Sequence, residues 1–338
     1  MIEIDGSAGG GQILRSALTL SAITGNSIRI INIRGARSNP GLRSQHLAAV
    51  TLLSDICQAD VSDVSVGATE LTFSPGTITT GRFEVEIGTA GSLPLVFDSV
   101  LPLATTISAP LEIHGRGGTD VRWAPTLDYF SHVKLGLLRA YGLSAAIECE
   151  RRGFYPAGGG RATLHIQPSS LDSITLQSRG DLQSASIWSR ASTTLKDRSV
   201  AERQAQHVES KLSESGIHIQ HSYSEYVQTK SPGSVLTIRL NYSHCVAGFA
   251  ALGEPGKPAE DVGLSAVKQA QAFIDTSGAV DEHMADQLLI FLSLTGGRIA
   301  IPKITNHIIT NSDLLELFGV NLDIIDNGPP YLIETTSL

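Results

Sequence analysis

The chain has 338 residues, of which 41% are hydrophobic and 17% are charged, and its formal net charge is −8. This length and apolar content exclude a wholly disordered protein and are typical of two domains, or of one large domain with an insertion. The negative balance argues against indiscriminate binding of polyanions, which needs a broad basic surface, but it is compatible with a local basic site.

The three cysteines, Cys57, Cys149 and Cys245, lie far apart and form no Cys-x-x-Cys pair. Neither a disulfide framework nor a structural zinc site is therefore expected, and reduced thiols favour a cytoplasmic location. No apolar run approaches the roughly 20 residues of a membrane helix. The strand-like first residues also lack the basic and then apolar pattern of a signal peptide. We expect no association with a membrane.

Three stretches of the chain follow one order: a glycine-containing approach, an apolar helix, a break and then a strand. Their helices and strands are expected at Ile13 to Gly25 and 28–33, at 92–103 and 111–113, and at Asp281 to Leu294 and 298–301. Each stretch also has a second expected helix. These helices begin at the Asn39-Pro40 pair and run toward Cys57, begin at Ala124-Pro125 and stop at Gly142, and begin at Asn311 and stop at Gly319.

Between the second and third stretches lies a segment with a different pattern of expected strands and helices. It reads as strands at 184–192, 235–240 and 245–252, a charged amphipathic helix at 200–212 and a turn at 253–258, with Ser/Thr-rich, loop-like tracts at 189–194 and 222–234. The predicted fold is therefore α+β. A large domain (1–181 and 274–338) contains three repeated α/β units, each a sheet with helices on one face, and a smaller α/β domain (182–273) is inserted into it.

An unusual cluster of charge lies near the N-terminus. Between Asp5 and Asp55 there is no acidic residue and no lysine. The same stretch holds five arginines: Arg15, Arg29, Arg34, Arg37 and Arg43. The planar guanidinium suits bidentate contact with phosphate, and three glycines precede Arg15 at a helix start, where free N–H groups favour anions. This pattern favours a phosphate or RNA-end site over a solvated arginine face.

Two further candidates lie near the C-terminus. His283 and Asp286 are three residues apart and share one helical face, where Asp286 could bind Mg²⁺ near phosphates, although a helix-capping role is the simpler interpretation from spacing alone. His307 follows an apolar strand. Most histidines have no chemical role, but a partly neutral imidazole can act as a nucleophile.

Six motifs in collinear order resemble the RNA 3′-terminal phosphate cyclase family across essentially the whole chain. They are Gly-Gly-Gly-Gln-Ile-Leu-Arg (9–15), Asn-Pro-Gly-Leu-Arg-Ser-Gln-His-Leu (39–47), Gly-Gly-Thr-Asp (117–120), Gly-Phe-Tyr-Pro-Ala-Gly-Gly-Gly (153–160), Ala-Asp-Gln-Leu (285–288) and His-Ile-Ile-Thr-Asn (307–311). The resemblance implies the repeated units and the insertion. It also implies ATP-dependent conversion of an RNA 3′-phosphate into a 2′,3′-cyclic phosphodiester through a histidine–AMP intermediate and an RNA-adenylate anhydride.

The resemblance also assigns residues. It makes His307 the nucleophile and places Pro125 and His283 on either side of adenine. Further nucleotide positions are Asp98, Met284, Ala285, Asp286 and Gln287, and the phosphate and RNA positions are Arg15, Arg34, Arg37, Arg43, Gln45 and His46.

One departure concerns the metal, Mg²⁺ or Mn²⁺ in this family. Relatives carry a metal-binding glutamate just before the glycine run, in a slightly longer loop; this chain has no carboxylate there, which leaves Asp5, Asp98 and Asp286 as candidates. Two alternatives stay open: a non-catalytic cyclase-like RNA-binding or ribosome-assembly factor, and a small-molecule transferase on a related scaffold. The oligomeric state, a homodimer included, is also open.

Overall fold

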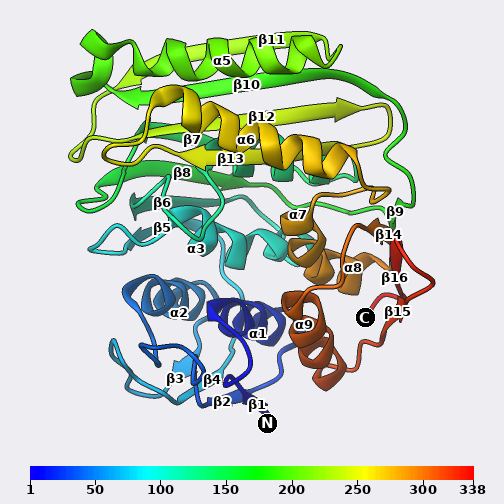
Figure 1. Cartoon of the computed structure of the whole chain (residues 1–338). Helices are drawn as coiled ribbons and strands as arrows, with labels where there is room; N and C mark the ends of the chain where they lie inside the picture. The colour runs from blue at the N-terminus through cyan, green and yellow to red at the C-terminus, as the bar shows by residue number, and fades with distance from the viewer.

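The computed structural model describes residues 1–338 and contains four sheets of four strands, with helices packed against them (Figure 1). Every sheet combines one parallel strand pair with two antiparallel pairs. The architecture is therefore a mixed α+β fold, as the sequence predicts.

Three of the sheets have the same strand order and the same pairing sense. In each, the first strand runs parallel to the second, the second pairs antiparallel with the fourth, and the fourth pairs antiparallel with the third. In spatial order their strands are β1 (Ile2–Asp5), β2 (Ile28–Ile31), β4 (Leu71–Ser74) and β3 (Asp60–Val61); β5 (Gly81–Glu86), β6 (Leu111–Gly117), β8 (Gly160–Ile166) and β7 (Ala145–Arg151); and β9 (Ile174–Leu176), β14 (Gly297–Ile301), β16 (Tyr331–Thr335) and β15 (Leu322–Ile325).

The fourth sheet lies between β9 and β14 in sequence and has a different order. Its strands are β11 (Ile219–Val227), β10 (Leu182–Ser192), β12 (Ser234–Tyr242) and β13 (Val246–Leu252). Although this whole sheet separates them along the chain, β9 and β14 pair directly in parallel. One continuous cluster of buried apolar side chains runs through all four sheets, and the fourth sheet with its helices adds a small second cluster of four residues.

Helices cover the sheets and line the middle of the molecule. They are α1 (Gly11–Thr24), α2 (Ser44–Cys57), α3 (Leu93–Val100), the short helix η1 (Leu101–Thr105), the π-helical turn η2 (Tyr129–Lys134), α4 (Leu135–Arg139), the short helix η3 (Thr193–Arg198), α5 (Val200–Glu214), α6 (Ala259–Ile274), α7 (Glu282–Gln287), α8 (Leu289–Thr295) and α9 (Asn306–Leu317). Helix α1 packs against α2, α3 and α9, and this brings an N-terminal helix and a C-terminal helix side by side (Figure 1).

Two predicted helix starts are wrong. Helix α2 begins at Ser44 rather than after Asn39-Pro40. The chain first turns at Gly41, which has φ +78 and lies so close to another backbone segment that a Cβ would come within 2.2 Å of the carbonyl oxygen of Gly67. Helix α9 begins earlier than predicted, because Thr305 caps it with its hydroxyl and Asn311 lies inside it. The predicted stops at Gly25 and Gly319 are confirmed, and both glycines adopt positive φ.

The Ser/Thr-rich tracts are also corrected. Much of 222–234 belongs to β11, a largely exposed edge strand, and β10 continues through Ser192 into the other tract. Polar residues suit a strand whose face meets water, so their composition resembles that of a loop. Helix α6 follows the turn at 253–258 and was not expected.

Candidate active site

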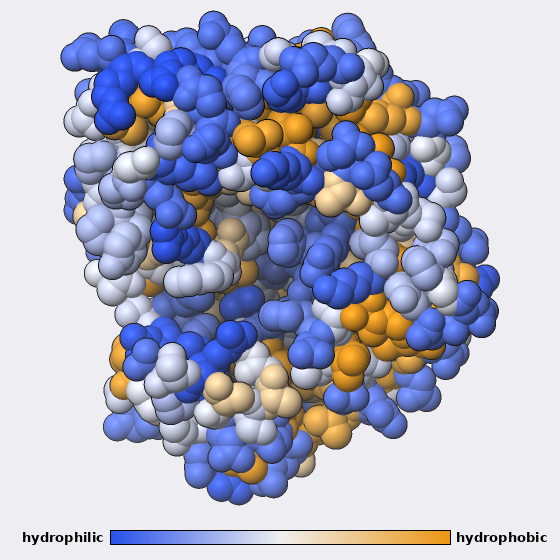
Figure 2. Space-filling view, in the orientation of Figure 1, coloured by the Kyte–Doolittle hydropathy of each residue, from blue (hydrophilic) through white to orange (hydrophobic).

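A large cleft opens near the centre of the molecule, with a volume of about 1620 Å³. The space-filling view shows this hollow and its mostly hydrophilic surroundings (Figure 2). Its walls include the start of α1, the loop before α2, part of α3, the segment 121–126, α7 and the start of α9. The fold therefore brings the predicted N-terminal and C-terminal motifs to one place.

Four of the five arginines of the acid-free stretch line this cleft, and none of them forms an ion pair with a carboxylate. They are Arg15, Arg34, Arg37 and Arg43. Burial, together with the nearby charges of Arg43 and Arg37, lowers the pKa of Arg34. Arg29 is different: it lies on β2 and pairs with Glu3 at 3.0 Å and Glu70 at 3.1 Å. Four guanidinium groups without a carboxylate partner are suited to a multiply charged anion.

The start of α1 adds to this anion site. Its N-cap, Gly10, provides no side-chain cap, so the first backbone N–H groups stay free. Arg37 lies over this turn, since a Cβ on Gly10 would be 3.0 Å from its Nη2 atom. Free N–H groups, the positive end of the helix dipole and a guanidinium therefore point at the same region.

His46 supports the arginines rather than adding a charge. Its side chain is buried, and its Nδ1 accepts a hydrogen bond from the Arg43 backbone N–H at 3.0 Å. Burial, followed by the charges of Arg15, Arg34 and Arg43, lowers the pKa of His46 to about 3, so the ring stays neutral. The neighbouring Gln45 faces the cleft and accepts a hydrogen bond from the Ser92 N–H at 2.9 Å, which connects α2 to the start of α3.

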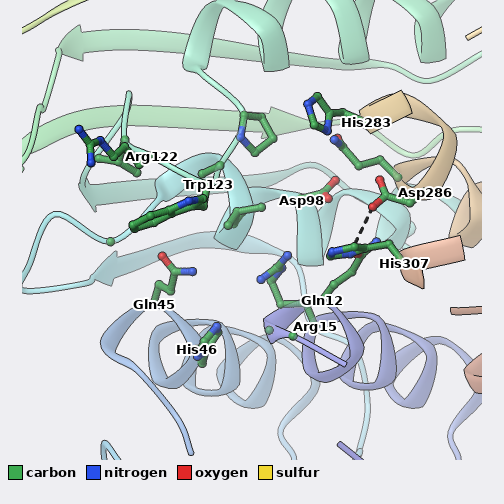
Figure 3. Close-up of a pocket in the computed structure, with 18 of the residues that line it drawn as sticks. Gln12, Arg15, Gln45, His46, Asp98, Arg122, Trp123, His283, Asp286 and His307 are labelled. Atoms are coloured by element: carbon green, nitrogen blue, oxygen red, sulfur yellow. Dashed lines mark hydrogen bonds and ion pairs between the residues drawn. The ribbon is translucent and has the colours of Figure 1, made fainter. Parts of the chain in front are cut away.

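His307 projects into the cleft from the first turn of α9 (Figure 3). Its side chain is 50% exposed; its Nδ1 hydrogen-bonds to Oε1 of Gln12 and lies 3.5 Å from Oδ2 of Asp286. Because Oε1 only accepts, Nδ1 carries the proton and Nε2 keeps its lone pair. Burial, together with the charges of Arg37 and Arg15, lowers the pKa of His307. The ring is therefore neutral near pH 7 and has a nucleophilic nitrogen.

Gln12 holds this arrangement and was missed as a functional residue, although it lies inside the glycine-rich motif. Its amide oxygen accepts the hydrogen bond from the His307 imidazole, and the same side chain lies next to Asp286, whose pKa burial raises to about 7. Gln12 thus orients the imidazole beside this carboxyl group.

Helix α7 presents its residues to the cleft in a fixed orientation. Asp281 caps it by accepting hydrogen bonds from the backbone N–H groups of His283 at 3.1 Å and Met284 at 2.9 Å, and it also accepts from the Tyr129 hydroxyl at 2.8 Å. As a result the cleft is lined by His283, Asp286 and Gln287. Met284 and Ala285 are fully buried on the opposite side. Their side chains therefore do not reach the cleft, although the resemblance to the family gives both as nucleotide positions.

The remaining nucleotide candidates, Asp98 and Pro125, also line the cleft. Asp98 projects from α3 and pairs with the ammonium of Lys134, which is completely buried and lies 5.7 Å from the ring centre of Phe291. A buried lysine needs such a partner, so Asp98 neutralises a charge as well as facing the cleft.

The metal candidates are not brought together. Asp5 is exposed outside the cleft, where it accepts hydrogen bonds from Ser7 N–H at 2.9 Å and Asn32 Nδ2 at 3.2 Å. No group of three His, Cys, Asp or Glu side chains is arranged to hold a metal ion. Asp98 and Asp286 are the two candidate carboxylates in the cleft. Separately, none of the helices is both long and apolar enough to cross a membrane.

Comparison with known proteins gives the family. The model of the RNA 3′-terminal phosphate cyclase family matches residues 7–324. This chain belongs to that family. Relatives named RNA 3′-terminal phosphate cyclase are 45% identical in Halobacterium salinarum, over 98% of this chain and 99% of the relative, and 39% identical in Pyrococcus furiosus, over 94% and 93%. A relative of the same name in Pyrobaculum aerophilum is 37% identical over 98% of this chain and 97% of its own.

Proposed function

We propose that this cyclase-family chain uses ATP to convert the 3′-terminal phosphate of RNA into a 2′,3′-cyclic phosphodiester, by way of a covalent His307–AMP intermediate. The observation that carries the proposal is the neutral imidazole of His307, half exposed in a cleft with four arginines that have no carboxylate partner. Family membership supports the reaction in general, and the geometry supports the route.

In the first step, Nε2 of His307 attacks the α-phosphorus of ATP. A P–N bond forms, the bond between the α-phosphorus and the bridging oxygen breaks, and pyrophosphate leaves. Gln12 keeps the Nδ1 proton in place, so that the attacking lone pair is on the nitrogen facing the cleft. Covalent catalysis divides one difficult displacement into easier ones.

In the second step, an oxygen of the RNA 3′-phosphate attacks the phosphorus of His307–AMP, the P–N bond breaks, and a phosphoanhydride joins RNA to AMP. In the third step, the neighbouring 2′-oxygen attacks the terminal phosphorus, its proton passes to solvent, and AMP leaves. Direct ring closure would have to expel hydroxide, so adenylation supplies the better leaving group.

The arginines account for the electrostatics of these steps. The guanidinium groups of Arg15, Arg34, Arg37 and Arg43 are in place before reaction, where they neutralise the negative charge that shifts between oxygens at phosphorus. We place adenine between His283 and Pro125, which both line the cleft, with Asp286 and Gln287 beside it.

A divalent metal fits this site only in a limited way. Mg²⁺ is commonly held by one or two carboxylates together with substrate phosphates, and Asp98 and Asp286 are each able to supply an oxygen. Such an ion would neutralise phosphate charge. The arginines and the N-terminus of α1 already neutralise part of this charge.

The fold division belongs to the same proposal. We assign residues 1–181 and 274–338 to a large domain of three repeated units and 182–273 to an inserted domain. The shared strand order and the β9–β14 pairing across the insertion support this assignment. The non-catalytic alternative is not favoured, because His307 is present and faces the cleft.

The test is incubation with ATP labelled at the α-phosphate. We expect an acid-labile, alkali-stable protein adduct in the wild type, none in His307→Ala, and normal labelling in Arg29→Ala, whose arginine lies outside the cleft. RNA ending in a 3′-phosphate becomes resistant to phosphatase, and RNA ending in a 3′-hydroxyl is unchanged. A His307→Ala protein labelled to the wild-type extent would refute the assignment.

A further inference from the structure

One aromatic side chain in the cleft has no part in the chemistry described above. The indole of Trp123 is 94% exposed, although it belongs to the lining of the cleft. The only other tryptophan, Trp188, is 7% exposed and stacks on the ring of His132 with centroids 4.1 Å apart. Large aromatic side chains normally bury most of their area. An almost fully exposed indole that lines a cleft therefore indicates a surface that a ligand covers.

The exposure of Trp123 does not come from a loosely held loop. The buried carboxylate of Asp120 accepts a hydrogen bond from the Leu127 N–H at 3.1 Å and so closes the segment on itself. Arg122 pairs with Glu254 of the 253–258 turn at 2.7 Å. Trp123 has φ +61, a conformation that bulky residues rarely adopt and that persists only where the surroundings impose it. The segment is thus anchored on both sides while the indole faces solvent.

The indole lies away from His283 and His307, although Pro125, which we place against adenine, belongs to the same segment. Figure 3 shows Trp123 on the opposite side of the cleft from His283 and His307, above Gln45, with Arg15 toward the middle. In the proposed reaction, adenine lies beside His283 and the reacting phosphates lie at His307 and the arginines. An RNA whose 3′-phosphate reaches this phosphorus has to leave the cleft on the other side, where Trp123 lies.

We infer that the indole of Trp123 is a stacking platform for a nucleobase at the 3′ end of the RNA substrate, an inference that rests on the proposed function. A flat indole face stacks on any base and makes no hydrogen-bond readout, so it binds RNA ends of different sequence, purines more tightly than pyrimidines. Stacking fixes the last nucleotides while the arginines hold the phosphate. Trp123 is therefore a positioning residue.

Kinetics test this role. Replacing one stacking aromatic side chain with alanine typically weakens binding by roughly 5- to 150-fold. We expect Trp123→Ala to raise KM for RNA by that factor with little change in kcat, and to form His307–AMP in the absence of RNA at the wild-type rate. Trp123→Phe should recover most of the loss. Tyr155→Ala is the matched control, because that ring is 75% exposed but lies outside the cleft, and it should behave as wild type.

Fluorescence gives a second readout that does not depend on turnover. In a Trp188→Phe background, Trp123 is the only tryptophan, and an RNA oligonucleotide ending in a 3′-phosphate should quench its emission by stacking. The same oligonucleotide with its last two nucleotides abasic should quench little. ATP alone should quench the emission less than this RNA does, since adenine is placed against Pro125 and His283 rather than on the indole.

The outcomes separate the two proposals. An unchanged KM for RNA in Trp123→Ala, together with unquenched emission in a protein that cyclises RNA, would overturn the stacking role and leave the proposed function standing. Slower His307–AMP formation with a raised KM for ATP would assign the indole to adenine and also overturn it. If the wild type forms neither an adenylate nor a cyclic phosphate, the proposed function fails. In that case, quenching of Trp123 emission that depends on the terminal bases of the RNA would still support the stacking platform.

Discussion

Gly11, the first residue of α1, is the position where one methyl group should do the most damage. A Cβ built there lies 2.1 Å from Nε2 of His46 and 2.8 and 3.0 Å from two other ring atoms, whereas ordinary contact begins at 3.4 Å. The ring cannot move away, because it is buried and its Nδ1 is hydrogen-bonded to the Arg43 backbone. In Gly11→Ala, therefore, either α1 or the arginine loop has to shift by about 1.3 Å.

Overpacking of this kind costs about 1–3 kcal/mol of folding free energy, and the better helix propensity of alanine returns at most about 1 kcal/mol. The effect on catalysis should be larger, because the residue after Gly11 is Gln12, which orients His307. A displacement of about 1 Å in a positioned group can lower a rate by about 100-fold. We expect Gly11→Ala to fold with slightly reduced stability and to form His307–AMP about 100-fold more slowly.

Urea denaturation and labelling with ATP measure the two effects. Gly10→Ala is the matched control for stability, because its Cβ would meet only the flexible end of Arg37, at 3.0 Å. His46→Ala removes the clash, so Gly11→Ala should cost almost nothing further in that background. If Gly11→Ala costs the same with and without the His46 ring, or if the variant is as active as wild type, the packing explanation is wrong.

Two further predictions concern the same chemistry, and a third concerns stability. Gln12→Ala should slow adenylation roughly 10- to 100-fold, because Nδ1 of His307 loses the acceptor that fixes its proton, and single-turnover labelling should show unchanged ATP binding. Because burial and arginine charge lower the pKa of His307 below its ordinary 6.5, protonation of the imidazole should reduce adenylation only below that pH. In Arg37→Ala this falling limb should move to higher pH, while Arg29→Ala should leave the profile of labelling against pH where it is. Arg179→Met should lower the urea midpoint, because the Arg179 guanidinium donates to four backbone carbonyls of the segment 273–278; a midpoint equal to that of wild type would show that this clamp is unimportant.

Much of the site was predictable because its signals are local. Helical periodicity separates residues 283, 286 and 287, which face the cleft, from Met284 and Ala285, which face the core. Spacing alone is therefore enough to reduce the five candidate nucleotide residues of 283–287 to these three. Strand alternation similarly distinguishes Arg29 from the other arginines. It lies between the buried Ile28 and Ile30 and faces outward opposite Glu3, its partner in the parallel pair.

The rest depended on contacts between distant segments. The start of α2 is set by the turn at Gly41, which is imposed by the backbone near Gly67, and nothing near Asn39 in sequence shows this. The exposure of Trp123 is likewise tertiary, because an isolated tryptophan reads as a core residue until its neighbours are known. Proximity in sequence also misled the choice of metal candidates, because Asp5 is near the glycine run in sequence but lies outside the cleft.

The packing of α1 against α9 brings His307, the proposed nucleophile, to arginines that lie far from it in sequence. Ser16 of α1 donates a hydrogen bond to the side-chain oxygen of Asn311 at 3.2 Å, and the Asn311 amide nitrogen donates to the carbonyl of His307 at 2.7 Å. Asn311 is buried, so this connection between α1 and α9 is shielded from water. The backbone of His307 is thereby held to α1 on one side of the ring while Gln12 holds Nδ1 on the other. Since α1 also presents Arg15 and its own N-terminus to the cleft, one helix sets the position of the imidazole relative to the anion site, and a change in α1 should affect nucleophile and anion binding together.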